Sequence, residues 1–190
     1  MNPLRFVALW LFLLAASLSA VPISLTNPAF ESGTERLIGG FDISGKDVPG
    51  WKNAGPHYTN SGVEVALQSG AVGGYVNTSG YVAFLKGSDG GAYQITSHTI
   101  VAGQVYRLVW KAGSISGSAG STSQQVSLFT TTNNGTTRNP IATSTAVLNA
   151  TNKVFETYVI EYTAKPAEAG AKLGIEFDNT ATNSNIIGFD

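Results

Sequence analysis

The chain has 190 residues and is nearly neutral, with 11 Lys and Arg against 12 Asp and Glu and no run of either sign. A nucleic-acid-binding protein needs a basic surface that neutralises phosphates, so this composition excludes that class of partner. The chain contains no Cys, which excludes disulfides, thiol catalysis and zinc–thiolate sites. A hydrophobic content of 43% is typical of a folded protein and argues against disorder.

Residues 1–20 have the pattern of a secretory signal peptide: Arg5 supplies a positive charge, residues 6–16 are apolar, and small residues end at Ala20. The apolar run is shorter than the ~20 residues of a membrane-spanning helix, so an uncleaved anchor is the weaker alternative. We therefore predict a secreted, extracytoplasmic protein that meets the membrane only through this leader. The remaining residues, 21–190, show no linker and are predicted to form a single domain.

Residues 40–46 read GFDISGK and match seven of the eight positions of a phosphate-binding loop. Such a loop requires Ser or Thr at the eighth position and runs into a helix. Here Asp47 places a carboxylate at that position, and the Val-Pro-Gly of residues 48–50 cannot begin a helix. We therefore interpret this segment as the approach to a sandwich strand that delivers Trp51 into the core.

After Trp51, short segments of alternating apolar and polar residues are separated by clusters of Gly, Asn and Ser, and none sustains a helical period. The segments predicted to be strands are 63–68, 81–87, 92–97, 105–111, 124–130, 154–164 and 172–178. A turn at Ala102-Gly103 predicts that 92–97 and 105–111 are antiparallel neighbours, and the low-complexity stretch 112–123 predicts a long flexible loop. Many short strands with short connections predict an all-β antiparallel β-sandwich or jelly roll.

Four motifs give the chain its resemblance to the galactose-binding-like jelly roll, a fold shared by many bacterial carbohydrate-binding modules. They are LTNPAFE at 25–31, Pro-Gly-Trp at 49–51, GGAYQITSHTIVAGQVYRLVW at 90–110 and the terminal Gly-Phe-Asp at 188–190. The last strand of such modules usually continues beyond this Asp. The resemblance therefore leads us to expect that the sequence lacks part of that strand.

The same resemblance implies a structural Ca²⁺ held by Glu31 and Asp190. Asp42 or Asp47 is a candidate for a further oxygen ligand. Calcium takes six to eight hard oxygen ligands, which can come from distant parts of a chain. In the alternative interpretation, these carboxylates are ordinary solvated residues.

A carbohydrate site needs an aromatic platform and side chains that form hydrogen bonds to hydroxyls. The candidates are Tyr58, Glu64, Tyr93 and Arg107, and each has the alternative of being an ordinary surface or half-buried residue. Trp110, which alternates in phase with its apolar neighbours, is predicted to be core. The main hypothesis is a calcium-stabilised module that binds a carbohydrate or another small extracellular ligand without catalysis.

A second hypothesis is enzymatic, because the same fold resembles the calcium-dependent Stig cyclases of cyanobacterial indole-terpenoid biosynthesis. That resemblance implies a proton-donating Asp, either Asp178 or Asp190, and a cavity lined by Tyr58, Tyr93 or Phe129. A third hypothesis is a structural surface protein. A closed apolar pocket holding a buried Asp favours the cyclase, and a groove of aromatic and amide groups favours the binding module; the sequence leaves the oligomeric state open.

Overall fold

The alternating pattern of the chain forms strands throughout the part that the structure describes. The structure is a computed structural model and describes residues 22–30, 50–54, 62–65, 76–78, 80–86, 91–115, 122–148, 153–180 and 186–190. The strands in these ranges are β1 (Lys52–Asn53), β2 (Gly62–Val65), β3 (Tyr81–Lys86), β4 (Gly91–Thr99), β5 (Val105–Ser114), β6 (Thr122–Thr131), β7 (Asn139–Leu148), β8 (Glu156–Thr163), β9 (Lys172–Asn179) and β10 (Ile186–Phe189). A short 3-10 turn, η1 (Pro166–Glu168), lies between β8 and β9. Within the described ranges, no helix has the length and apolar character to cross a membrane.

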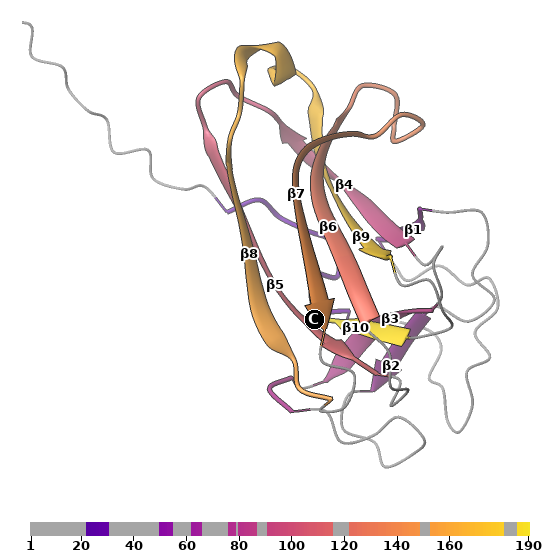
Figure 1. Cartoon of the computed structure of the whole chain (residues 1–190). Helices are drawn as coiled ribbons and strands as arrows, with labels where there is room; N and C mark the ends of the chain where they lie inside the picture. Colours follow the sequence, from indigo (N-terminus) through magenta and orange to yellow (C-terminus); the bar gives the residue numbers. More distant parts are fainter. Residues whose placement is uncertain are drawn as a thin grey trace, which may run out of the picture.

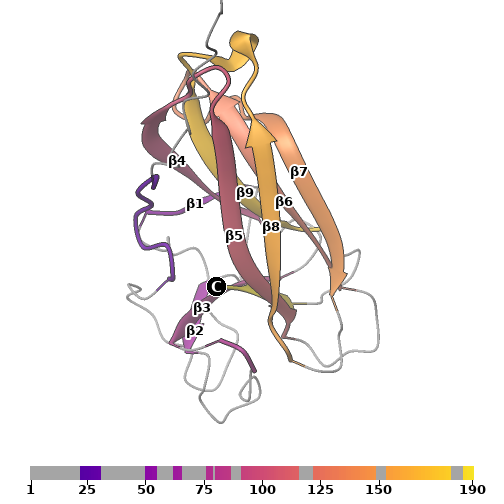
Figure 2. The same ribbon diagram turned by 90° about the vertical axis from the view of Figure 1, so that its left-hand side faces the viewer.

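Two antiparallel five-stranded sheets pack face to face (Figures 1 and 2). Sheet A has the strand order β1-β4-β9-β6-β7, and sheet B has the order β2-β3-β10-β5-β8. Every pair of neighbouring strands among β1 to β10 is antiparallel, and neighbours such as β4 and β9 are far apart in the sequence. The predicted all-β sandwich of the jelly-roll type is therefore confirmed.

An aromatic cluster fills the space between the two sheets. Phe177 of β9 lies at its centre, with ring centroids 5.3 Å from Trp51, 6.5 Å from Trp110 and 4.6 Å from Phe189. Trp51 and Trp110 are only 4% and 3% exposed, so the prediction that both are core residues is confirmed. Burying large aromatic side chains in this way is a main source of stability for a chain without disulfides.

Three local predictions need correction. The segments 92–97 and 105–111 are not neighbours, because β4 belongs to sheet A and β5 to sheet B, so the connection through Gly103 crosses between the sheets. The stretch 112–123 is not all loop, since β5 extends to Ser114 and β6 begins at Thr122. Finally, β7 was not predicted, because Thr, Ser and Ala separate its few large apolar residues, Ile141, Val147 and Leu148, and because it includes Pro140, a residue that favours edge strands.

Two tyrosines of β8 make the stability of the fold fall with rising pH in the alkaline range. Burial, together with a hydrogen bond to Glu156, raises the pKa of Tyr158 to about 12. A hydrogen bond to Glu168, helped by desolvation, raises the pKa of Tyr162 to about 12. Both exceed the value of 10.0 for a free tyrosine, so the stabilisation is complete below pH 10 and is lost as the pH rises from 10 to 12.

We therefore expect the melting temperature to fall between pH 10 and pH 12 more steeply in the wild type than in a Tyr158→Phe/Tyr162→Phe variant. Phe has no proton to lose, so the variant lacks this contribution at every pH. Melting curves at half-unit intervals of pH measure the difference. Parallel pH profiles for the two proteins would contradict the assignment.

Candidate functional site

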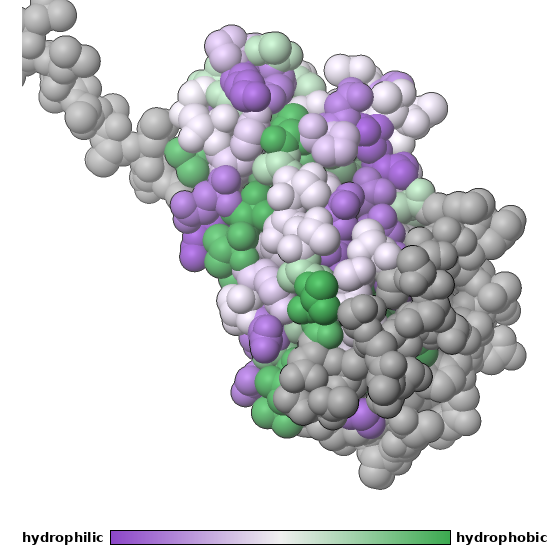
Figure 3. All heavy atoms as spheres, in the orientation of Figure 1, coloured by the Kyte–Doolittle hydropathy of each residue, from purple (hydrophilic) through white to green (hydrophobic). Residues whose placement is uncertain are grey.

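A polar hollow opens on the face of sheet A that points away from sheet B. Its volume is about 310 Å³, and it is lined by Gln125, Ser127, Thr136, Arg138, Pro140, Glu176 and Asp178. We call it the outer hollow. Figure 3 shows largely hydrophilic surface around the loop between β6 and β7, at the upper right. A volume near 300 Å³ is at the lower end of the range for small-molecule sites.

The strand register explains why these side chains share one face. Because side chains alternate along a strand, Glu176 and Asp178 of β9 both point away from the core. Asp178 lies opposite Gly91 of β4 and Gln125 of β6, and Glu176 lies opposite Tyr93 and Ser127. A Cβ added to Gly91 would lie 3.5 Å from Asp178 Oδ1, so the missing side chain at Gly91 leaves room for this carboxylate.

Tyr93 and Phe129 form the aromatic part of the same face. Their ring centroids are 6.1 Å apart in an edge-to-face arrangement, and the Phe129 ring lies directly across Gly174 of β9. Tyr93 is 9% exposed and Phe129 is 0% exposed. The predicted aromatic platform at Tyr93 is therefore covered, not open to solvent.

The β6–β7 loop supplies the cover. Asn134 and Gly135 have φ angles of 55° and 87°, a left-handed turn that suits Asn and Gly. A Cβ on Gly135 would lie 2.9 Å from the Tyr93 ring and 2.8 Å from Ile95, so only Gly allows the loop to rest on β4. Thr131 Oγ1 accepts the Gly135 N–H at 3.0 Å, which holds the turn in place.

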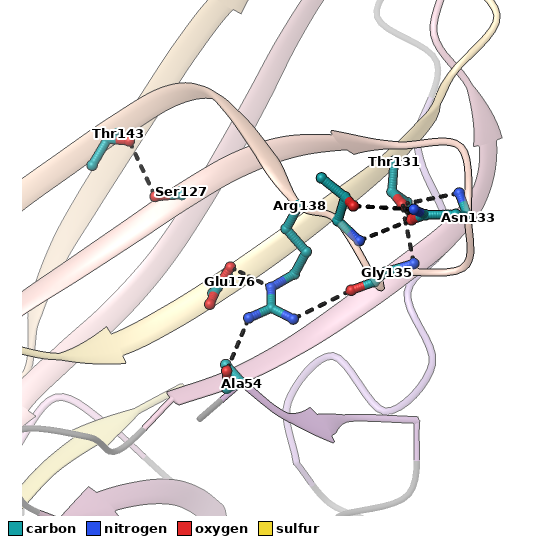
Figure 4. Close-up of polar contacts among 9 residues, drawn as sticks. Ala54, Ser127, Thr131, Asn133, Gly135, Arg138, Thr143 and Glu176 are labelled. Atoms are coloured by element: carbon teal, nitrogen blue, oxygen red, sulfur yellow. Dashed lines mark hydrogen bonds and ion pairs between the residues drawn. The ribbon is translucent and has the colours of Figure 1, made fainter. Parts of the chain in front are cut away.

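Arg138, at the end of this loop, joins the loop to β9, to β4 and to Ala54, the residue that follows β1 (Figure 4). Its Nε donates to Glu176 Oε2 at 2.9 Å, Nη1 to the Gly135 carbonyl at 3.3 Å and Nη2 to the Ala54 carbonyl at 2.9 Å. The guanidinium carbon also lies 4.4 Å from the centre of the Tyr93 ring. Arg138 thus balances the charge of Glu176 and forms a wall of the outer hollow.

Replacing Arg138 by Lys is expected to destabilise the fold by about 1–3 kcal/mol. The three acceptors are spread around the planar guanidinium, and the single nitrogen of Lys cannot reach all of them. The side chains of Arg138 and Glu176 are only 24% and 20% exposed, so water replaces the lost contacts poorly. Urea unfolding measures the loss. The matched control is Arg107→Lys, whose partner is Glu161 in a pair that is 57% and 62% exposed; that change should cost less than about 1 kcal/mol. Equal losses in the two variants would contradict this account of the loop.

The structure brings together some of the predicted residues and separates others. Tyr93, Phe129 and Asp178 meet on the outer face of sheet A. Arg107 lies in sheet B, where it forms an ion pair with Glu161 at 3.0 Å, and Glu64 lies on β2 at the far edge of sheet B. The predicted ligands Tyr58, Glu31 and Asp42 fall outside the described residues.

Asp190, the other candidate acid and a predicted calcium ligand, lies next to β5. Its carboxylate accepts a hydrogen bond from Thr78 Oγ1 at 2.8 Å and lies 3.6 Å from Lys111 Nζ. The Lys111 ammonium therefore supplies a counter-charge. In the part of the chain that the structure describes, no group of three or more acidic or His residues could hold a metal. The calcium site on Glu31, Asp190 and Asp42 remains a prediction.

The predicted calcium site implies that a chelator lowers the melting temperature by about 8–16 °C. Removing a ligand held at 1,000 times its dissociation constant costs about 4 kcal/mol, and each kcal/mol shifts the melting temperature by about 2–4 °C in a domain of this size. The Asp190→Asn variant should lose this response to the chelator. A wild-type melting temperature that is unchanged by chelation would show that the prediction is wrong.

Most of the outer hollow was not predicted from the sequence. Arg138, Glu176, Gln125, Ser127 and Thr136 carry no motif, and their proximity depends on the non-local pairing of β6 with β9 and on the loop that follows β6. One signal was available: Glu176 alternates in phase with Asp178 in the segment KLGIEFDN. Two carboxylates on the polar face of a strand could have been identified as a pair.

Comparisons with known proteins point to one family. The HpiC1-like family, described as HpiC1 cyclase, matches residues 21–190. The Stig cyclase Fisc from Fischerella sp. TAU, in complex with (3Z)-3-(1-methyl-2-pyrrolidinylidene)-3H-indole, has a TM-score of 0.65 and 22% identity over 90% of this chain and 95% of that chain. A cyclase from the same organism, in complex with 4-(1H-indol-3-yl)butan-2-one, has a TM-score of 0.65 and 22% identity over 90% and 94%.

A more distant match is a CBM22-1 xylan-binding domain from Paenibacillus barcinonensis, with a TM-score of 0.49 and 12% identity over 73% of this chain and 81% of that chain. No curated protein sequence matches this chain. The predicted resemblance to the jelly roll of Stig cyclases is confirmed by the family match and by the two Fischerella structures.

Proposed function

The chain belongs to the HpiC1-like cyclase family, and from this premise we propose that it is an enzyme that closes a ring in a small unsaturated molecule at the outer hollow. The proton donor is Asp178. From the sequence alone, the main hypothesis was a module that binds a ligand without catalysis, and a cyclase was the alternative. The family match supports that alternative better than the main hypothesis.

The observation that carries the proposal is the position of Asp178. This carboxyl group lines the outer hollow together with hydrogen-bonding side chains, and the rings of Tyr93 and Phe129 lie on the same face of sheet A, covered from solvent. Asp190, by contrast, belongs to the region of sheet B and lies against Lys111. Of the two candidate acids, Asp178 has the surroundings that suit a bound substrate.

The chemistry of the proposed step is an isomerisation. Asp178, as the carboxylic acid, donates its proton to an electron-rich atom of the substrate, and a second π-bond of the same molecule attacks the cation that results. A carbon–carbon bond forms, and the carboxylate takes back a proton when the product becomes neutral. The mass of the molecule does not change, and no oxidant or reductant is consumed.

The other residues of the outer hollow would hold the substrate in place. Gln125 offers an amide, and Ser127 and Thr136 offer hydroxyls, so a substrate with one polar group can be oriented by hydrogen bonds. Arg138 and Glu176 form the ion pair that fixes one wall. An indole derivative, the class of ligand named for the two Fischerella structures, combines a polar N–H with an unsaturated body and fits these requirements.

One observation favours a second function, the binding of a hydroxylated ligand without catalysis. The lining of the outer hollow is mainly amide, hydroxyl and charged groups, and the rings of Tyr93 and Phe129 are covered. A sugar or another polyol could use these hydrogen bonds. In either case the N-terminal leader supports the proposal that the protein acts outside the cytoplasm.

The test is incubation of the purified protein with a panel of alkenyl and prenyl indoles, followed by chromatography with mass detection. We expect at least one substrate to give a new peak of unchanged mass that is absent without protein. The same panel and a set of oligosaccharides are then tested for an increase in melting temperature. If oligosaccharides stabilise the protein and no indole is bound or converted, the second function replaces the first.

A further inference from the structure

The outer hollow contains one polar side chain whose hydrogen-bonding groups have no partner in the described part of the chain. This side chain is Gln125 of β6, which is half-buried and lines the hollow together with Asp178. An amide carries an acceptor oxygen and two donor hydrogens. All of them are open to a ligand that enters the hollow.

The remaining hydrogen-bonding side chains that line the hollow have partners within the protein. Three of these bonds join Ser127 with Thr143 and Arg138 with Glu176 (Figure 4), and Thr136 with the carbonyl of Asn133. These side chains can turn to a ligand only if they give up an existing hydrogen bond. Gln125 gives up none, so its amide is the group that recognises a ligand at the lowest cost.

The strand register places Gln125 beside the proposed proton donor. In the pairing of β6 with β9, Gln125 lies opposite Asp178, and side chains opposite each other in an antiparallel pair have Cβ atoms about 4.5–5.5 Å apart. On its other side, Asp178 lies opposite Gly91 of β4, which has no side chain. Gln125 is therefore the one residue directly across from Asp178 that carries a functional group.

An uncharged acceptor at this position suits the cation that follows proton transfer. When a carbon conjugated with an N–H takes a proton, positive charge spreads onto the nitrogen, and the N–H becomes a stronger donor. A hydrogen bond from this N–H to the Gln125 carbonyl would strengthen as the charge develops, so it would stabilise the transition state more than the substrate. A carboxylate at position 125 would instead compete with Asp178 for the proton, because two adjacent carboxyl groups share one.

We propose that Gln125 selects substrates in which an N–H is conjugated with the carbon that Asp178 protonates, a role that rests on the proposed cyclase function. Indoles and other N–H enamines belong to this class, and N-alkylated compounds and simple alkenes do not. In an enamine, one carbon separates the nitrogen from the carbon that takes the proton, so one small molecule contacts both neighbouring side chains. The N–H bond stays intact and nothing bonds covalently to Gln125, so the reaction is still an isomerisation.

The probes are the best N–H substrate of the panel and its N-methyl analogue, which cannot donate at that nitrogen. The wild type should favour the N–H compound by at least about tenfold in kcat/KM, the size of a hydrogen bond to a group that becomes charged. Gln125→Met keeps the length of the side chain without the amide, and it should reduce this preference to about twofold or less. If this variant fails to fold, Gln125→Leu is the second choice. The matched control, Thr145→Val, changes the neighbour of Gln125 on β7, which does not line the hollow, and should keep the full preference.

A binding measurement separates the role of Gln125 from the cyclase function. A 3-propylindole and its N-methyl derivative have no alkenyl group to close a ring, so calorimetry measures binding alone. If the N–H compound binds at least about twofold more tightly to the wild type and not to Gln125→Met, the role of Gln125 is supported even when no panel member is converted. Conversion of the panel with an N–H preference that persists in Gln125→Met, or with no such preference in the wild type, would overturn the role and leave the cyclase function intact. If nothing is bound or converted, both proposals are wrong.

Discussion

An Asp178→Asn variant is expected to lose cyclase activity by about 100-fold or more while keeping its fold. Asn has the same shape as Asp but no acidic proton, and a positioned general acid contributes about 10²- to 10⁴-fold to a rate. The loss should be in kcat, because the side chain still occupies its place in the outer hollow. Initial rates with the best substrate of the panel, together with a melting curve, measure the two effects separately.

Two further substitutions make this result specific. Glu176→Gln removes the other carboxylate of β9, which is in an ion pair with Arg138. This variant should lower the melting temperature, and its loss of kcat should be much smaller than that of Asp178→Asn. Asp190→Asn changes the carboxylate beside Lys111 and should leave kcat within about threefold. A kcat that survives in Asp178→Asn and disappears in Asp190→Asn would transfer the role of proton donor to Asp190.

The sequence predicted the elements of this site but not their assembly. Alternation within KLGIEFDN assigns Asp178 to the polar, outer side of β9. Alternation within GAYQITSHT predicts the wrong side for Tyr93, because the apolar Tyr93 and Ile95 lie on the outer side of β4 under the β6–β7 loop, whereas Gln94 and Thr96 point inward. That these two strands are neighbours follows from non-local pairing, in which Tyr93 lies opposite Glu176. No local pattern determines which strands pair when the connections are long.

Arg138 shows a different limit. Its three hydrogen bonds depend on a left-handed turn at Asn134 and Gly135 and on the carbonyl of Ala54, 84 positions earlier in the chain. The Asn-Gly pair predicts a turn, but not the surface on which the turn rests. In the same way, Ala102-Gly103 predicted a hairpin, whereas in the structure the chain passes from sheet A to sheet B at this turn. A hairpin and a connection between sheets need the same turn residues, so the sequence does not distinguish them.

The second large effect is expected from Gly174→Ala, which should destabilise the fold by about 3 kcal/mol. A Cβ at this position would overlap the ring of Phe129, which is 0% exposed and packs edge-to-face on Tyr93. Because the covering loop rests on Tyr93 and Ile95, the ring has no free space into which it can rotate. Thermal unfolding should show a decrease of about 6–12 °C, at about 2–4 °C for each kcal/mol.

The control for this prediction is the partner substitution. Phe129→Leu removes the atoms that overlap the new methyl group, so the cost of Gly174→Ala should be at least ~1 kcal/mol smaller in that background, a coupling of the size seen between residues in contact. Gly170→Ala, at a glycine with φ of 86° and no atom within 4 Å of the added Cβ, should cost only about 1 kcal/mol. If Gly174→Ala cost no more than Gly170→Ala, Phe129 would not lie across β9. The packing of Tyr93 and Phe129 under the β6–β7 loop, on the face of sheet A that also carries Asp178, would then have to be revised.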